Sequence, residues 1–488
     1  MTRRRLHAAR IAALALFLLA ATPAAAGALP GRSFFGVNIQ PLIKFSFVPY
    51  SNWGAFISTM ASDDLSTARM DVQWYWVEPN PPTAAGHTYI WDQPASPQAS
   101  MDNLISLLAS NHVRLSAVID SPPPWAAGRG TMLSAAYYGD FAAFAAAFAA
   151  RYGVDGSFWK ANPALPYLPV LDFEVWDEAN SADFWSGAPD PSAYAAAFAQ
   201  VSAAIHAVDP SATVLASIGW QNFQSYVSQL YATGIASSID GIGFHPYAPD
   251  APGIMLLNEQ LRATLASAGA ASLPIYDTET GQPVVRSGRG AEYAYDGEVT
   301  DAARAATESL AGDALARSDC GVDDYLIYGI TGSGTGLEPN DEGFMGIFNA
   351  ATDMPDRTGS ALIAASKRWR AHRHGGIVLC GSGTTPARDL LRLGVRLSRP
   401  GPTCAAATVS YHGNPLEGAE LVLRTADGRV ASAATNAYGQ ASVCLQNGPA
   451  INHFTADAEL HNVATSVIHR CPVSTAPCRA IHDAARKP

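Results

Sequence analysis

Short apolar runs alternate with alanine-rich stretches from about residue 34 to residue 370. The runs are rich in β-branched and aromatic residues, which favours strands, and the stretches between them favour helices. We expect eight strands, at residues 34–40, 67–74, 113–120, 170–178, 212–219, 239–247, 273–281 and 322–330. Strands that are apolar on both faces and separated by helices form parallel sheets. Eight such units predict an α/β fold closed into a TIM barrel. An open doubly wound sheet is less favoured, because no GxGxxG motif follows the first predicted strand.

The clearest predicted helix begins after Asp190. Asp190-Pro191 is typical of an N-cap followed by a first-turn proline, and Asp209-Pro210 ends the pattern. Apolar residues recur at helical spacing within it, at Tyr194, Phe198, Val201, Ile205 and Val208. A similar stripe consists of Phe141, Phe144 and Phe148. We expect both stripes to pack against the barrel strands.

The periodicity changes after about residue 372. Residues 406–445 alternate between apolar and polar side chains and are interrupted by turn signals such as Asp427-Gly428, which is typical of a small all-β sandwich of the immunoglobulin-like kind. The predicted organisation is a signal peptide at 1–26, a TIM-barrel catalytic domain at 27–372, a connection at 373–402, a β-sandwich accessory domain at 403–471 and a tail at 472–488.

The first residues have the features of a secretory signal. Four arginines are followed by an apolar stretch from Ile11 to Ala21 and then by Ala24-Ala25-Ala26. The stretch is too short to cross a bilayer, and no later run is long enough to insert into a membrane. We therefore expect a secreted protein that is cleaved near Ala26.

Charge and cysteine content narrow the classes of partner. Removing residues 1–26, which hold four arginines and no acidic residue, changes the formal charge from −11 to −15. Such an acidic chain is a poor partner for nucleic acid or anionic lipid, and a neutral substrate fits better. All six cysteines follow residue 319, which in an exported protein suggests disulfides whose pairing stays open; no CxxC pair indicates zinc.

Polar residues gather where the predicted strands end. The most informative stretch is FEVWDEAN at 173–180, in which an apolar run opens onto Asp177 and Glu178. The other polar strand ends carry Gln40, Gln73, Asp120, His245, Glu279 and Tyr328. The carboxyl ends of barrel strands meet at one mouth, where active sites lie. Glu178 on the fourth strand and Glu279 on the seventh would thus share a pocket, and paired carboxylates are the apparatus of glycoside hydrolysis.

These residues resemble those of the clan A glycoside hydrolases, and family 39, with its β-xylosidases, α-L-iduronidases and exopolysaccharide hydrolases, is the most similar. The resemblance covers about residues 34–370. It is carried by EVWDEAN at 174–180, GFHPY at 243–247, YDTETG at 276–281 and Arg69 on the second strand.

The resemblance implies a role for each matching residue. Glu178 is expected to be the general acid/base and Glu279 the nucleophile, with Arg69 pairing with Glu279 to keep it ionised. His245 and Tyr247 are expected to shape the floor of the pocket. A nucleophile needs a low pKa and an acid a raised one, so we expect a nearby cation at Glu279 and burial or negative charge at Glu178. Trp74, Trp125 and Tyr328 are further candidates for contact with a sugar ring.

One position departs from the family pattern. The family has Asn-Glu-Pro, whereas Asp177 and Ala179 flank Glu178 here. An ionised Asp177 accepts hydrogen bonds but donates none, and its charge beside Glu178 would raise the pKa of that acid. A protonated Asp177 is the alternative. We expect the reaction type to be unchanged by this replacement, but the identity of the sugar is left open.

The sequence thus predicts a secreted retaining O-glycoside hydrolase that needs no metal or organic cofactor. Its carboxyl groups should lie about 5 to 5.5 Å apart, against about 6.5 to 9.5 Å for an inverting enzyme. Two alternatives stay open: a glycan-binding barrel without catalysis, and a transglycosylase that uses the same site. Oligomeric state, sugar and linkage stay open as well.

Overall fold

The structure is a computed structural model. It describes residues 33–44, 48–126, 133–185, 187–284, 299–332, 341–371, 393–401, 404–425, 428–445, 453–459, 469–472 and 479–480 of the chain. The predicted signal peptide and most of the predicted tail lie outside these ranges.

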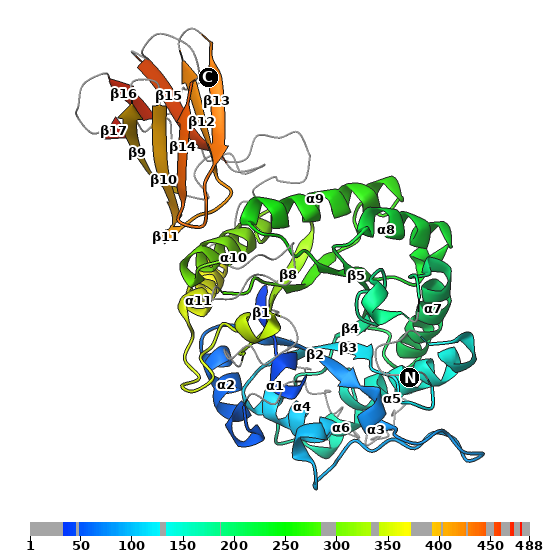
Figure 1. The fold of residues 1–488 in the computed structure, drawn as a ribbon. Helices are drawn as coiled ribbons and strands as arrows, with labels where there is room; N and C mark the ends of the chain where they lie inside the picture. Colours follow the sequence, from blue (N-terminus) through cyan, green and yellow to red (C-terminus); the bar gives the residue numbers. More distant parts are fainter. Residues whose placement is uncertain are drawn as a thin grey trace, which may run out of the picture. The chain divides into compact units, whose positions relative to one another are not determined.

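Eight parallel strands form a closed barrel in chain order, each hydrogen-bonded to the next and the last to the first (Figure 1). They are β1 (Phe35–Asn38), β2 (Thr67–Gln73), β3 (Arg114–Asp120), β4 (Asp172–Val175), β5 (Thr213–Gly219), β6 (Gly241–His245), β7 (Ile275–Thr280) and β8 (Val322–Tyr328). All eight predicted strands are therefore present, and the TIM-barrel prediction is confirmed.

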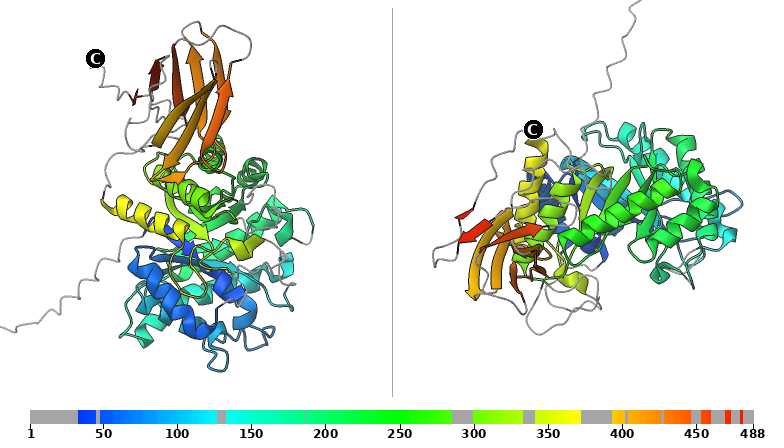
Figure 2. Two further views of the ribbon diagram at one scale, coloured as in Figure 1. Left: turned by 60° about the vertical axis from the view of Figure 1, so that its left-hand side comes forward. Right: turned by 90° about the horizontal axis from the view of Figure 1, so that it is seen from above.

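The helices lie outside the strands of the barrel in every view (Figure 2). In the described residues they are α1 (Gln40–Lys44), α2 (Tyr50–Ser62), α3 (Trp74–Val77), α4 (Met101–Ser110), α5 (Tyr138–Tyr152), α6 (Ser157–Ala161), α7 (Pro191–Val208), α8 (Phe223–Ala232), α9 (Ala251–Ser267), α10 (Asp301–Leu315) and α11 (Arg357–Ala371). Short 3-10 helices span Pro97–Ala99, Ala135–Tyr137, Ala182–Phe184, Ile235–Ser237 and Asp341–Phe344. None of the helices in the described ranges combines the length and apolar character of a membrane span.

Helix α7 shows how local sequence determines these elements. The Asp190 side chain accepts hydrogen bonds from the backbone N–H groups of Ser192 and Ala193, so it caps the helix as predicted. The stripe that begins at Tyr194 is buried through Ile205, whereas Val208 is 44% exposed because the helix ends there. The aromatic stripe of α5 is likewise buried against the strands.

The C-terminal strands form two antiparallel sheets, drawn from orange to red in Figures 1 and 2. One contains β9 (Leu393–Gly401), β10 (Cys404–Tyr411), β11 (Asn414–Pro415) and β14 (Gln440–Cys444). The other has the order β13 (Val430–Ala434), β12 (Glu420–Thr425), β15 (His453–Glu459), β16 (His469–Pro472) and β17 (Arg479–Ala480). Burial alternates along β10 and β14, as the predicted sandwich requires.

Two features of this region refine the sequence interpretation. The segment at 373–402, which we expected to be a connection, contains the strand β9; an edge strand tolerates the Pro400 that obscured it. A disulfide joins Cys404 to Cys444, which are paired across β10 and β14, and Cys320 is disulfide-bonded as well. Disulfides are therefore present, as the even number of cysteines suggested.

Candidate active site

Arg69 lies at the centre of the polar residues inside the barrel. It is on β2, is fully buried, and contacts three carboxylates from two other strands and a turn. Nε is 2.8 Å from Glu174 Oε2, Nη1 is 2.7 Å from Glu279 Oε2, and Nη2 is 3.0 Å from Asp177 Oδ1. A guanidinium presents its donors in one plane. Arg69 therefore holds the ends of β4 and β7 at a fixed spacing and brings Glu279 and Asp177 to adjacent nitrogens.

Both oxygens of Glu279 accept hydrogen bonds. Asn38 at the end of β1 donates its side-chain N–H to Oε2 at 3.0 Å, the oxygen that Arg69 also contacts. Tyr247, just after β6, donates its hydroxyl to Oε1 at 2.8 Å. Three separate elements thus orient this carboxylate, and its side chain remains 15% exposed.

A sharp turn after β4 presents Glu178 to the mouth of the barrel. β4 ends at Val175, earlier than predicted, and both Trp176 (φ 69°) and Glu178 (φ 37°) adopt left-handed backbone conformations. Non-glycine residues rarely adopt this conformation, and such strain occurs at functional sites. The turn leaves the Glu178 side chain 13% exposed, with Oε1 3.0 Å from His245 Nδ1. The backbone of Glu178 donates to Ser217 Oγ, which fixes the turn against β5.

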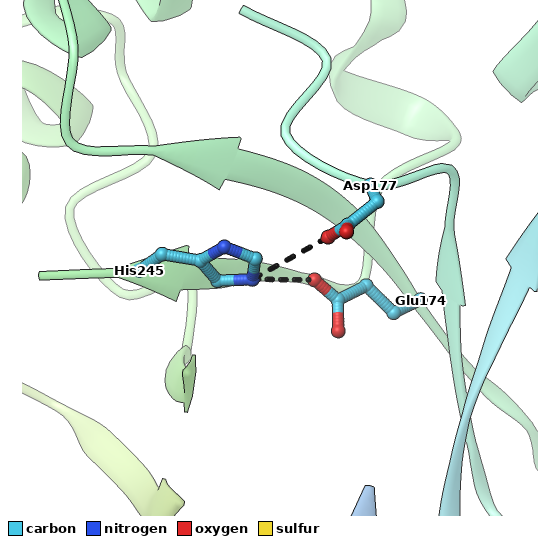
Figure 3. A group of neighbouring side chains, drawn as sticks. All are labelled: Glu174, Asp177 and His245. Atoms are coloured by element: carbon cyan, nitrogen blue, oxygen red, sulfur yellow. Dashed lines mark hydrogen bonds and ion pairs between the residues drawn. The ribbon is translucent and has the colours of Figure 1, made fainter. Parts of the chain in front are cut away.

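His245 connects Glu178 to the buried carboxylate of Glu174. Figure 3 shows its ring facing Glu174 and Asp177. Its Nδ1 faces Glu178, and its Nε2 is 3.3 Å from Glu174 Oε1 and 3.9 Å from Asp177 Oδ1. Glu174 is fully buried and also accepts hydrogen bonds from Ser217 on β5 and Thr278 on β7. Glu174 therefore joins four strands from inside the barrel, in agreement with the structural role that a strand-interior acid suggests.

Charge and burial shift the pKa values of His245 and Glu174 in opposite directions. Burial is the largest influence on His245 and lowers its pKa, but the charge of Glu279 and the hydrogen bonds to Glu174 and Glu178 outweigh it, so the pKa is raised well above the ordinary value. The imidazolium donates from both nitrogens. Burial would raise the pKa of Glu174, yet the charge of Arg69 and the contacts with His245 hold it well below its usual range. These groups are therefore ionised at neutral pH.

The pKa of Glu279 is raised above its ordinary value. Burial is the main cause; His245 and Arg69 lower the pKa, while the charges of Asp177 and Glu178 raise it. Arg69 thus acts in the direction expected from the sequence, but the neighbouring acids and burial exceed its effect. An added positive charge near Asp177 would favour the ionised form of Glu279.

Glu174, Asp177 and His245 form a cluster that could hold a metal ion, with ligand atoms within 4.8 Å of one another (Figure 3). Arg69 already binds the same groups: Nε contacts Glu174, and Nη2 contacts Asp177 and lies 3.2 Å from His245 Nε2. A metal ion there would have to displace a buried guanidinium. The donor set therefore fits an arginine better than a metal ion.

The aromatic candidates lie in different surroundings. Trp74 is fully buried, stacks on Phe144 of α5 and donates its Nε1–H to Glu78. A ring without an exposed face cannot stack on a sugar, so the interpretation of Trp74 as a substrate contact is wrong. Its neighbour Trp125 is partly exposed, packs edge-on against Trp74 and donates to the Glu78 carbonyl.

Tyr328 and Tyr247 lie together near Glu279. With Met345 they form a small apolar cluster against which Trp220 packs, separate from the main core. Because Tyr247 also donates to Glu279, this cluster borders the Glu279 carboxylate. Tyr328 therefore stays a candidate for contact with substrate.

Two important residues were not assigned to the site from the sequence. Asn38 ends the first strand, and the signal available was its position two residues before Gln40, which we had named instead. Glu174 lies inside the fourth predicted strand, and its contact with His245 makes it part of the charged network. Among the predicted residues, the structure brings together Arg69, Asp177, Glu178, His245, Tyr247 and Glu279.

Solved structures of glycoside hydrolases share this fold. A family 39 glycoside hydrolase from the gut symbiont Bacteroides cellulosilyticus aligns with a TM-score of 0.51 and 14% identity, over 85% of this chain and 81% of that one. A monomeric β-xylosidase from Caulobacter crescentus aligns with a TM-score of 0.50 and 16% identity, over 92% and 98% of the two chains. A family 39 enzyme from Xanthomonas axonopodis pv. citri aligns with a TM-score of 0.50 and 15% identity, over 85% of this chain and 92% of that one.

The likeness to family 39 is therefore confirmed for the fold, including the region that follows the barrel. No protein-family model matches the sequence, and no curated protein matches it. At these identities the activity has to be argued from the residues of this chain.

Proposed function

We propose that this protein is an exported retaining glycoside hydrolase with Glu279 as nucleophile and Glu178 as general acid/base. The observation that carries the proposal is that both carboxylates are partly exposed at one barrel mouth and are connected by a single buried network through Arg69 and His245. Two carboxylates with different environments at one site are what the double displacement requires. The likeness to family 39 structures supports the same reaction class.

The contacts suggest which atoms react. Glu279 Oε2 is held by Arg69 and Asn38, whereas Oε1 accepts a hydrogen bond only from Tyr247 among the described residues. Oε1 therefore attacks the anomeric carbon. Glu178 Oε1 faces His245 Nδ1, so the proton for the leaving oxygen is carried on Oε2. As the glycosidic bond breaks, that proton moves to the leaving oxygen and a glycosyl ester forms on Glu279.

The second step reverses these roles. Glu178, now ionised, takes a proton from water through Oε2, and the hydroxide that results breaks the ester and regenerates Glu279. His245 holds Glu178 in place in both steps because its Nδ1 remains a donor throughout. The configuration at the anomeric carbon is inverted twice and so retained.

The experiment is a screen of aryl glycosides and of bacterial and plant polysaccharides with the parent protein, Glu178→Gln and Glu279→Gln. Glu420→Gln, which alters an exposed glutamate of β12, is the matched control. We expect the parent and the control to hydrolyse the same substrate, with the first-released product retaining its anomeric configuration by NMR. Loss of general acid catalysis should lower the rate of Glu178→Gln by about 10²- to 10⁴-fold.

The outcomes distinguish the alternatives. Full activity of both site variants would refute the site assignment. Inverted product would refute the covalent intermediate, and trapping of Glu279 by a fluorinated glycoside would support it. Binding of glycans without turnover would favour a glycan-binding protein, and sugar transfer to added alcohols would favour a transglycosylase.

The proposal of export rests on the N-terminal sequence and on the disulfides, which are typical of oxidising compartments. Sequencing the N-terminus of the protein recovered from the culture medium tests it. A mature chain that begins near Gly27 is the expected result.

A further inference from the structure

Asp177 presents an unused acceptor beside the two catalytic carboxylates. Among the described residues, Arg69 Nη2 donates to Oδ1 and no side chain or backbone group donates to Oδ2. The side chain is 16% exposed, close to the exposure of Glu178 and Glu279 at the same mouth. Neither catalytic step described above uses Asp177. A substrate group at this position therefore meets a carboxylate oxygen.

A second carboxyl group lies near Asp177. Asp120 ends β3 and is 8% exposed, and its Oδ1 has no hydrogen-bond partner among the described residues. Burial is the main cause of a pKa well above the usual value, and the charges of Asp71 and Asp177 raise it further. Asp120 therefore favours its protonated form. The negative charge that a ligand meets here is that of Asp177.

The balance of charge in the network is negative. Arg69 and His245 face Glu174, Asp177, Glu178 and Glu279. Even when Glu178 carries the catalytic proton, the carboxylates of Glu174, Asp177 and Glu279 remain against two cations. An uncharged ligand would leave this imbalance in a largely buried site, where like charges repel strongly. A cationic ligand group would relieve it.

The geometry limits where such a group belongs on the sugar. Glu279 and Asp177 bind the two terminal nitrogens of one guanidinium and so lie side by side. With Glu279 at the anomeric carbon, a carboxylate beside it falls nearest to the substituent on the adjacent carbon. Asp177 also directly precedes Glu178, which faces the leaving oxygen.

We propose that the substrate is an amino sugar with a protonated amine on the carbon next to the anomeric carbon, and that Asp177 Oδ2 binds this ammonium group. The inference rests on the proposed hydrolase function and identifies its substrate class. It also gives the departure from the family's asparagine a reason, because an asparagine amide would direct its N–H groups or a neutral oxygen at the ammonium. By neutralising Asp177, the amine would favour the ionised form of Glu279.

The test compares 4-nitrophenyl glycosides that differ only in the position-2 group: amine, hydroxyl or acetamide, each in the gluco, galacto and manno series. Assays run at about pH 6, where an amine of ordinary pKa is protonated. In at least one series we expect kcat/KM for the amine to be at least about tenfold higher than for the hydroxyl and the acetamide. That ratio corresponds to about 1.4 kcal/mol. Asp177→Asn should reverse this preference.

Two results would overturn the inference. One is a kcat/KM for the amine that is no higher than for the hydroxyl in every series. The other is an Asp177→Asn variant that changes kcat/KM for the amine and for the hydroxyl by the same factor. Hydrolysis of neutral glycosides would in that case leave the proposed function intact. A preference for the acetamide would assign Asp177 to an uncharged N–H group and would also overturn the inference.

A binding measurement separates the inference from catalysis. Calorimetry with Glu178→Gln uses glucosamine tetramer, its N-acetylated form and cellotetraose as probes. We expect the glucosamine tetramer to bind at least about tenfold more tightly than the others, with an affinity that falls as salt is added and is lost in Glu178→Gln/Asp177→Asn. If no glycoside is hydrolysed, the proposed function fails and this binding result decides the inference alone. Equal binding of the three probes would refute it.

Discussion

Nδ1 of His245 lies 3.0 Å from Oε1 of Glu178, so a single imidazole joins the proposed acid/base to the buried charges beneath it. The opposite ring nitrogen faces Glu174, which is itself bound by Arg69. A displacement of one of these residues is therefore transmitted to the others. Each prediction below alters one member of this network or of the structure that supports it.

Replacement of His245 should alter both rate and pH dependence. The charge of His245 lowers the pKa of Glu279, so His245→Gln should raise that pKa and move the acidic limb of kcat/KM to higher pH. Removing one partner of a buried charged hydrogen bond costs about 1–3 kcal/mol, so we expect kcat/KM to fall about fivefold or more. An unchanged acidic limb would show that His245 does not act on Glu279.

On neutral glycosides, Asp177→Asn should move the acidic limb of the kcat/KM profile to lower pH. The Asp177 charge raises the pKa of Glu279, and its removal lets the nucleophile ionise at lower pH. Asp183→Asn, which removes an exposed acid from the same loop, is the control and should leave the profile unchanged. A shift to higher pH in Asp177→Asn would contradict the proposed electrostatic arrangement.

Arg69 should be essential for stability as well as for activity. Arg69→Met leaves Glu174, Asp177 and Glu279 buried or half-buried without their cation, and breaking such a group typically costs about 3–5 kcal/mol. Arg370→Met, which removes an exposed ion pair with Asp64, should cost no more than about 1 kcal/mol. Urea unfolding of both variants measures the difference, and similar losses would argue against the central role of Arg69.

Gly219 should be required for the position of Glu178. A Cβ at this residue would lie 2.7 Å from Glu178 Cδ, so Gly219→Ala should push the carboxylate away from His245. Because the flexible end of a side chain can move, we expect a small loss of stability and a fall in kcat of about tenfold or more. Gly187→Ala, where an added Cβ would meet nothing within 4 Å, is the control. Unchanged kcat in Gly219→Ala would mean that Glu178 tolerates displacement.

Glu308 should make the protein less stable as the pH rises. Burial raises its pKa to about 7, although the Tyr325 hydroxyl, which donates to Oε2 at 2.6 Å, opposes the shift. In the unfolded chain the pKa is about 4.3, so the folded protein holds the extra proton and its stabilising effect is lost between about pH 4.3 and pH 7.

The loss attributed to Glu308 amounts to about 4 kcal/mol over that interval, since one pKa unit corresponds to about 1.4 kcal/mol. Glu308→Gln keeps an acceptor for Tyr325 and removes the titration. We expect its free energy of unfolding to be higher than the parent's at pH 8 and to vary less with pH. Parallel stability curves for the two proteins would show that Glu308 is ionised in the folded state.

Much of this molecule was predictable because its patterns are local. The alternation of apolar runs with helical stretches gave the eight barrel strands, and the Asp190-Pro191 signal gave the start of α7. The exposure of Val208 and the strand β9 could not be predicted, because a stripe does not show where a helix frays and an edge strand can carry a proline. Trp74 looked like a mouth residue by position but is covered by α5.

By itself the sequence determined the barrel, the acids and cations at its strand ends and the replacement of an asparagine by Asp177, since periodicity and residue type are properties of short segments. Only the tertiary structure decided which atoms meet. Arg69 contacts residues 105, 108 and 210 positions away in the chain, and the left-handed turn at Trp176 and Glu178 aims the acid at His245. Closing the barrel brings these distant side chains together, and their mutual charges then set the protonation on which the proposed chemistry depends.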